Sequence, residues 1–287
     1  MSLAVRVPAS TSNLGAGFDC VGLALDLWLE ARLFEGDGPA TYAGTLADLS
    51  PERDLIARTM RSAGLSGRRR LEVRSEIPVG KGLGSSGAAV VAGLALVDLA
   101  RGAELNRDRL LEQATALEGH PDNVGPAVYG GLFLASQGGG RLTLSPAVGI
   151  ALAVPEASID THAARARLPR EVAREVAIAQ ASRAAALIQG LTQGQPALIA
   201  YGMEDQLAVP HRKDLIPGFD AAVVAGRAAG AYGVTISGAG SALLGIGPPH
   251  LMGHVASAMA EALTQAGNRA AGMTPRVAMG GLTVTTR

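Results

Sequence analysis

The segment Pro78-Val-Gly-Lys-Gly-Leu-Gly-Ser-Ser-Gly-Ala-Ala89 decides the fold and lies between an expected strand and an expected helix. Glycines at 80, 82 and 84 let backbone N–H groups approach an anion closely. The helix expected to begin at Ser85 aims its free N–H donors and its positive dipole end at the same place, and no Asp or Glu occupies its first turn. The segment therefore predicts a phosphate-binding loop. A tight glycine turn capped by a serine is the plainer alternative.

The loop also matches G-x-G-x-x-G over Gly82-Leu-Gly-Ser-Ser-Gly87, so a dinucleotide site has to be weighed. The strand before it argues against an NAD-binding oxidoreductase, because a Rossmann first strand is a continuous apolar run. Residues 70–77 instead alternate apolar and charged side chains. The Walker A form is absent as well, since Lys81 is followed by glycine and not by Ser or Thr.

The rest of the chain predicts an α+β protein with mostly antiparallel strands and helices on one side of each sheet. An alternating strand over 3–7 is expected to stop at Pro8, and a polar loop over 9–17 to follow it. Asn106 is expected to cap a helix that Gly119 closes, with a loop after it. We expect two domains, 1–150 and 151–287. The further expected elements are strands near 23–33, 131–135, 141–145, 148–154, 234–246 and 276–285 and helices near 51–63, 85–99, 170–190, 196–207, 217–230 and 249–266.

Composition narrows the class of protein. The 287 residues carry 25 basic and 25 acidic side chains, so no bulk charge favours binding to nucleic acid or to an anionic membrane. The single cysteine excludes an internal disulfide and fits a reducing cytosol. The longest uncharged run, residues 82–97, is too short and too rich in Gly and Ser to span a bilayer. We expect a cytoplasmic protein.

Four segments carry a family resemblance. The loop resembles the second motif of the GHMP kinase superfamily, and Ser237-Gly-Ala-Gly-Ser-Ala-Leu-Leu244 resembles its third. Val7-Pro-Ala-Ser-Thr-Ser-Asn-Leu-Gly-Ala-Gly-Phe-Asp19 and Glu118-Gly-His-Pro-Asp-Asn-Val124 are similar to segments of the homoserine kinases within it. The resemblance implies the two-domain GHMP kinase fold, with a ferredoxin-like C-terminal domain. It also implies ATP-dependent phosphorylation of the side-chain hydroxyl of L-homoserine in threonine biosynthesis, and it suggests a homodimer.

The resemblance also implies the nucleotide and metal sites. The position of Glu118 supports the metal site independently of the resemblance. It lies at the expected C-terminus of a helix, where the helix dipole disfavours a carboxylate by about 0.3–1 kcal/mol. A bound Mg²⁺ would make a carboxylate favourable there. The family pattern assigns the metal to Ser86 and Glu118. It assigns ATP to Pro78, Val79, Gly80, Lys81, Gly82, Leu83, Gly84, Ser85, Ser86, Gly87, Ala88, Gly238 and Gly240.

A zwitterionic substrate needs an acid for its ammonium and a cationic fork for its carboxylate. The family pattern places the ammonium near Asp19 and Asp122, with His120 close by. It places the carboxylate on Arg165 and Arg212. The family pattern places the reacting hydroxyl on Asn13 and Asn123. The alternative for each asparagine is an Asx turn in a loop. The candidate catalytic residues are therefore Asn13, Asn123, Asp122 and Arg212.

Two alternatives stay open in the sequence: a GHMP kinase for another small alcohol, such as mevalonate or shikimate, and an inactive nucleotide-binding paralogue. Mevalonate and shikimate have no ammonium, so Asp19 and Asp122 argue against them. Only two of the 25 basic residues are lysines, Lys81 and Lys213, and neither lies in the first motif. We therefore expect in-line positioning and Mg²⁺ charge neutralisation with little general-base help. Asp54 falls where the family often has an asparagine near the adenine.

Overall fold

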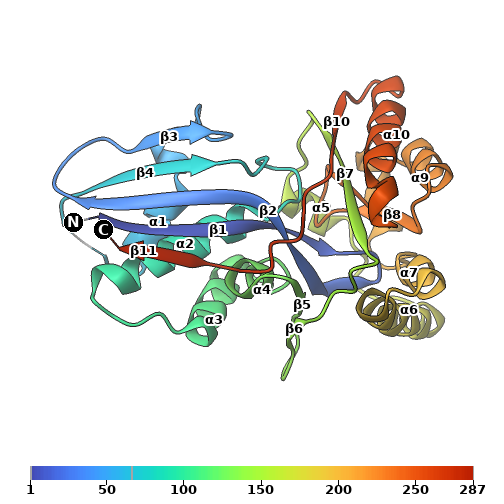
Figure 1. Cartoon of the computed structure of the whole chain (residues 1–287), viewed down its shortest axis with the longest axis horizontal. Coiled ribbons are helices and arrows are strands. Elements are labelled where there is room, and N and C mark those ends of the chain that lie inside the picture. Colours follow the sequence, from blue (N-terminus) through green and yellow to red (C-terminus); the bar gives the residue numbers. More distant parts are fainter. Residues whose placement is uncertain (1, 66, 287) are drawn as a thin grey trace.

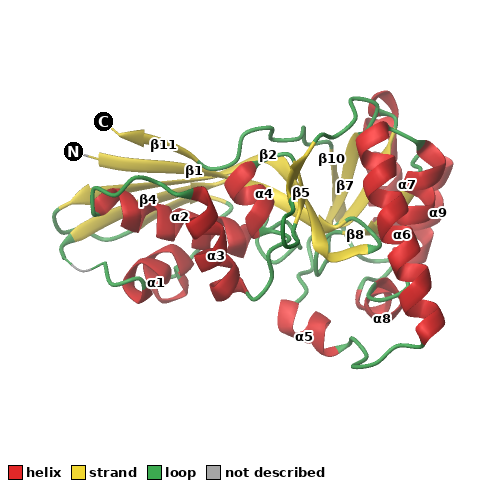
Figure 2. Cartoon of the chain, turned by 90° about the horizontal axis from the view of Figure 1, so that it is seen from below, coloured by secondary structure: helices red, strands yellow, loops and turns green. Residues whose placement is uncertain are grey.

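The computed structural model describes residues 2–65 and 67–286. The chain forms an elongated body in which two sheets follow one another along the long axis (Figure 1). Figure 2 shows helices gathered on one side of the first sheet and a second group of helices at the opposite end of the molecule. This arrangement confirms the predicted α+β class with two mostly antiparallel sheets.

The first sheet has the strand order β11-β1-β2-β4-β3, with β5 added beside β2 and β6 beside β5. Every pair in it is antiparallel except β3 with β4. Its strands are β1 (Ser2–Asn13), β2 (Gly17–Glu35), β3 (Thr41–Gly44), β4 (Arg69–Ser75), β5 (Leu132–Leu134), β6 (Gly140–Leu142) and β11 (Thr283–Thr286).

Strand β1 does not stop at Pro8 as the sequence predicts. The pairing partner jumps from Trp28 opposite Pro8 to Leu25 opposite Ala9, so the proline lies at a bulge. A bulge tolerates a residue without an N–H donor. Residues 9–13, expected in a loop, are therefore a buried extension of the strand that reaches the middle of the molecule.

Helix α2 (Ser85–Ala100) packs against β1 and is buried on all sides from Gly87 to Asp98, as expected for a helix without a polar face. It is flanked by α1 (Leu55–Ser62) and α3 (Arg107–Glu118). Asn106 caps the N-terminus of α3 and Gly119 its C-terminus, as predicted. Helix α4 (Val124–Tyr129) lies where a loop was expected. Its Pro126 stands in the first turn, where no intrahelical partner for an N–H is needed.

The second sheet has the order β10-β7-β9-β8 and is covered by α9 and α10. Helices α6 and α7 pack together, and their buried apolar residues belong to the larger core, which contains residues of both sheets. None of the helices in the described part of the chain is long and apolar enough to cross a membrane. The elements of this half are β7 (Gly149–Pro155), α5 (Thr161–Ala166), α6 (Arg174–Gln193), α7 (Pro196–Gly202), α8 (Val209–Arg212), α9 (Phe219–Ala228), β8 (Gly233–Ile236), β9 (Leu243–Gly247), α10 (Met252–Gln265) and β10 (Ala270–Met273).

The chain ends in the sheet in which it began. β11 pairs with β1, and the segment before it donates from the Leu282 N–H to the Ala127 carbonyl at 2.9 Å. The strand expected near 276–285 is thus, as β11, part of the first sheet. The division at 150 and 151 into two domains stays a prediction.

The packing of β2 on the connection between α3 and α4 generates a prediction. A Cβ atom on Gly22 would lie 1.8 Å from the Asp122 carbonyl oxygen, so a side chain there must displace backbone. We expect Gly22→Ala to lower the free energy of unfolding by about 1–3 kcal/mol, measured by urea titration. The matched control is Gly253→Ala in α10, where a Cβ meets nothing within 4 Å; its stability should stay the same or rise by up to about 1 kcal/mol. Equal stabilities of the two variants would contradict the prediction.

Candidate active site

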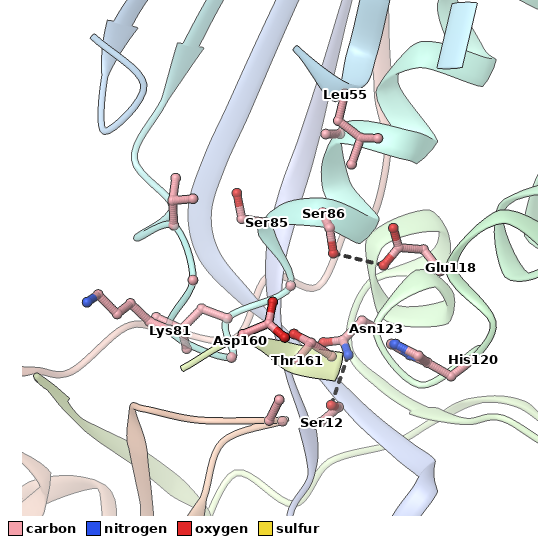
Figure 3. Close-up of a pocket in the computed structure, with 18 of the residues that line it drawn as sticks. Ser12, Leu55, Lys81, Ser85, Ser86, Glu118, His120, Asn123, Asp160 and Thr161 are labelled. Carbon is pink, nitrogen blue, oxygen red and sulfur yellow. Dashed lines mark hydrogen bonds between the residues drawn. The ribbon is translucent and has the colours of Figure 1, made fainter. Parts of the chain in front are cut away.

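A cavity of about 500 Å³ lies where the two sheets meet, and the glycine-rich loop forms one of its walls (Figure 3). The inner end of β1, the connection from α3 to α4, helix α5 and residues 238–239 form further walls. These segments are far apart in the sequence. The cavity therefore depends on the whole fold.

The loop has the geometry of an anion cradle. Gly80, Gly82 and Gly84 all have left-handed backbones, with φ of 70°, 73° and 70°. A Cβ on Gly82 would lie 2.0 Å from the Ser237 carbonyl oxygen, so only glycine fits against the third motif. No side chain caps α2 and no acidic residue lies in its first turn, which leaves the N-terminal donors of the helix for a ligand.

Lys81 does not direct its ammonium group at the loop's anion site. Its Nζ donates to the Glu156 carbonyl and to Ser158 Oγ, the latter at 3.0 Å, and burial lowers its pKa. Figure 3 shows the side chain pointing away from Ser85 and Ser86. The side chain thus ties the loop to the end of β7, and the predicted contact with ATP is left to the backbone of Lys81.

Ser86 and Glu118 meet at the cavity wall, although they come from the start of α2 and the end of α3. Ser86 Oγ donates to Glu118 Oε2 at 2.8 Å (Figure 3). A hydroxyl and a carboxylate side by side are the oxygen ligands that Mg²⁺ accepts beside phosphate oxygens. The residues present therefore fit the predicted metal, with the remaining ligands coming from water and nucleotide.

Asn123 and Asp122 are held by a network of hydrogen bonds. The Asn123 amide donates to Ser12 Oγ at 3.0 Å and accepts from Ser10 Oγ at 2.9 Å. Asp122 is 2% exposed, and its Oδ1 lies 2.7 Å from His120 Nδ1. This hydrogen bond raises the pKa of His120, while burial opposes the rise. Asp122 is therefore partly committed to orienting His120.

Asn13 and Asp19 have left-handed backbones, with φ of 71° and 53°. Such conformations in residues other than glycine cost about 1–2 kcal/mol each and concentrate at functional sites. The Asn13 side chain holds the turn, because its Oδ1 accepts from the Asp19 N–H at 3.0 Å and its Nδ2 donates to the Gly238 carbonyl at 2.9 Å. Asn13 thus links both halves of the molecule at the cavity.

The two predicted arginines differ in their surroundings. Arg165 forms a bidentate ion pair with Asp19, at 2.8 and 3.0 Å. Arg212 is 3% exposed, and its Nε donates to the Ala164 carbonyl at 3.1 Å. Burial and the charge of Arg165 both lower the pKa of Arg212. Arg212 has no ion pair among the described residues, so the cavity holds a buried cation suited to an anionic ligand.

The comparisons with known proteins agree with this geometry. Residues 53–131 match the family described as GHMP kinases N terminal domain. A homoserine kinase of Synechocystis sp. is 38% identical over 93% of both chains, and one of Nostoc punctiforme is 37% identical over 85% of this chain and 86% of its own. The chain belongs to the homoserine kinase family. The crystal structure of homoserine kinase from Cytophaga hutchinsonii superposes with a TM-score of 0.85 at 28% identity, covering 99% of this chain and 97% of that one.

Most residues that the resemblance to homoserine kinases nominates do line the cavity. Four do not: Pro78, Gly87, Ala88 and Gly240. Gly87 and Ala88 are buried within α2, while Gly240 lies behind Gly82, on the side of the third motif. The roles of the lining residues as ligands stay predictions, because lining a cavity does not assign a role.

The sequence reasoning missed the apolar end of the cavity. It lies next to the loop and is lined by side chains from β3, the segment after it, α1 and β4. The sequence predicts the helix near 51–63 and the strand over 70–77, but no local signal indicates that their apolar side chains meet in one cavity. The residues that line this end are Tyr42, Leu46, Leu49, Leu55, Ile56 and Val73.

Asp54 is part of this end, and both of its oxygens have partners. Oδ1 accepts from the Ala57 N–H at 3.0 Å and caps α1, while Oδ2 accepts from the Tyr42 hydroxyl at 2.8 Å. Burial and this hydrogen bond raise the pKa of Tyr42. Asp54 therefore positions both a helix and an aromatic ring of the cavity wall.

We expect Asp54→Ala to lower the free energy of unfolding by about 2 kcal/mol, because it removes a helix cap and leaves the Tyr42 hydroxyl without its acceptor. Asp54→Asn keeps an acceptor for the cap and should cost less than about 1 kcal/mol. Urea unfolding followed by far-ultraviolet circular dichroism measures both. Equal losses in the two variants would show that the cap and the tyrosine contact contribute little.

Proposed function

We propose that this protein transfers the γ-phosphoryl group of ATP to the side-chain hydroxyl of L-homoserine, giving ADP and O-phospho-L-homoserine. The observation that carries the proposal is the joint placement, in one cavity, of the phosphate-binding loop, the Ser86–Glu118 oxygen pair and a charged cluster suited to an amino acid. Family membership supports the same reaction, since the similar proteins are homoserine kinases.

The nucleotide occupies the loop and the apolar end. Its phosphates lie over the backbone N–H groups of 80–86 and the start of α2, where donors and the helix dipole favour negative charge. Its base lies between the loop and α1, against Tyr42 and the neighbouring leucines. Val79, which is 45% exposed without a ligand, gains an apolar partner there.

Ser86 and Glu118 would hold Mg²⁺, which would supply positive charge beside the phosphate oxygens of the nucleotide. Glu118 then gains a favourable partner at the C-terminus of α3, where the helix dipole disfavours its carboxylate. Ser86 lies at the second position of α2, so the metal and the phosphates share one helix end.

The amino acid lies on the other side of the phosphates. Its carboxylate faces the buried cation of Arg212, with Arg165 beside it, and its ammonium faces Asp19. Asn13 and Asn123 line the same cavity, are held in place by their hydrogen bonds to Asp19 N–H and to Ser10 and Ser12, and direct the hydroxyl. Mevalonate and shikimate lack the ammonium that the Asp19 carboxylate is suited to bind, so kinases for those alcohols are not favoured.

The reaction needs positioning more than a base. Asp122, the acid at the position where other GHMP kinases have a base, is buried and hydrogen-bonded to His120. Lys81 is engaged at the end of β7, and Lys213 pairs with Asp220 at 3.0 Å. The hydroxyl is aligned with the γ-phosphoryl group by the asparagines, and a loose transition state proceeds without early proton removal. We also propose that the protein is cytoplasmic and forms a homodimer. The mass of the assembly, measured by light scattering, tests the homodimer.

ADP release from Mg·ATP, measured in parallel with homoserine, threonine, serine, mevalonate and shikimate, tests the proposed function. We expect kcat/KM to be highest for homoserine, because it alone presents a primary hydroxyl at the right distance from a zwitterion. ATP without an acceptor is the control for hydrolysis. Turnover of homoserine no faster than that of the other alcohols would overturn the proposal.

Glu118→Gln tests the metal site. The substitution keeps the shape of the side chain but removes the charge, so we expect the Mg²⁺ concentration for half-maximal activity to rise by about tenfold or more. Glu112→Gln, on the exposed face of the same helix, is the matched control and should not change it. An unchanged Mg²⁺ requirement in Glu118→Gln would remove Glu118 from the metal site.

A further inference from the structure

The Asp19–Arg165 ion pair joins two groups that the proposed function assigns to opposite charges of the substrate. The pair is bidentate, and both side chains are about one third exposed, 34% for Asp19 and 36% for Arg165. Both line the cavity. Without substrate, therefore, the binding group for the ammonium and one binding group for the carboxylate neutralise each other.

The two partners are not equally fixed. Asp19 is held by its left-handed backbone and by the hydrogen bond from its N–H to Asn13 Oδ1. Arg165 extends a long side chain from the last turn of the six-residue helix α5. An ion pair with one third of each side chain exposed is screened by water and is weak enough to open. Opening thus moves the arginine and leaves the aspartate in place.

The neighbouring cation makes an unaccompanied opening unfavourable. The guanidinium groups of Arg165 and Arg212 both lie over the Phe18 ring, at 5.9 and 5.2 Å from its centroid, and the charge of Arg165 lowers the pKa of Arg212. Arg212 has no ion pair of its own in the part of the chain that the structure describes. Once released from Asp19, Arg165 adds a second unpaired cation beside Arg212. Asp19, in turn, is left as an unpaired carboxylate at the cavity wall. Both costs disappear only when a ligand supplies both charges.

We propose that the Asp19–Arg165 pair acts as a specificity gate for zwitterionic alcohols, which open it by replacing both partners at once. This inference rests on the proposed function and deepens it. An alcohol that carries an ammonium but no carboxylate pairs with Asp19 and leaves Arg165 without a counter-charge. One with a carboxylate only faces an arginine that is already occupied. The two charges of the substrate therefore act cooperatively and not as independent contacts.

The test uses two analogues that each lack one charge of homoserine: 4-hydroxybutyrate, without the ammonium, and 3-aminopropan-1-ol, without the carboxylate. Dissociation constants are measured by titration calorimetry in the full chain with a non-hydrolysable ATP analogue present. In Asp19→Asn, Arg165 is free, so we expect the Kd of 4-hydroxybutyrate to fall by about fivefold or more, while the Kd of homoserine rises by about tenfold or more. In Arg165→Gln, Asp19 is free, and the Kd of 3-aminopropan-1-ol should fall similarly.

Two controls remove the same charges without touching the pair. Asp160→Asn takes a carboxylate from the cavity wall and keeps a capping side chain at α5. Arg167→Gln removes an exposed cation just beyond that helix. Each should change the analogue constants by less than about twofold, because only long-range charge is altered. Circular dichroism and the affinity for the ATP analogue establish that all four variants are folded.

The outcomes separate the inference from the proposed function. If the unmodified protein phosphorylates homoserine but Asp19→Asn leaves 4-hydroxybutyrate binding unchanged, the charges bind independently and the gate is overturned while the function stands. Equal gains in Asp19→Asn and Asp160→Asn also overturn the gate, because they reduce it to a general charge effect. If the unmodified protein does not phosphorylate homoserine, the function fails, and the gate fails with it.

Discussion

The contact between the glycine-rich loop and the third motif is the interaction on which the site depends. Ser237 lies under the loop, and its Oγ donates to the Gly82 carbonyl at 2.7 Å. The Ala242 N–H donates to the Lys81 carbonyl at 3.0 Å, and the Gly238 N–H to the Ser12 carbonyl at 3.1 Å. One backbone junction thus shapes the phosphate cradle and holds the two sheets together. A loop shaped only by its own sequence would lack this support.

Much of this arrangement follows from local sequence. The alternation in 70–77, the apolar run after Ser85 and the caps Asn106 and Gly119 predict elements that the structure contains. These signals are local, since propensity and capping act within a few residues. The catalytic and binding candidates came from matched motifs. The fold accounts for why motifs separated by more than a hundred residues share one cavity.

What the sequence could not predict depends on contacts between distant segments. Pro8 argues for a strand end unless the partner strand supplies a bulge, and the return of β11 to β1 has no sequence signal. The apolar end of the cavity joins residues of four separate segments between 42 and 73, and the Asp19–Arg165 pair joins residues 146 positions apart. Lys81 illustrates the same limit, because its neighbours at 156 and 158 become visible only when β7 is placed.

The pairing of β11 with β1 has a consequence for how the molecule can be handled. The two chain ends lie side by side at one end of the elongated body, on adjacent strands (Figure 1). The cavity lies away from them, at the glycine-rich loop and residues 238–239. The second sheet is consequently an insertion, tethered to the first by two chain crossings. A short linker can join the ends into a circular permutant, and a fusion partner at either terminus stays clear of the substrates.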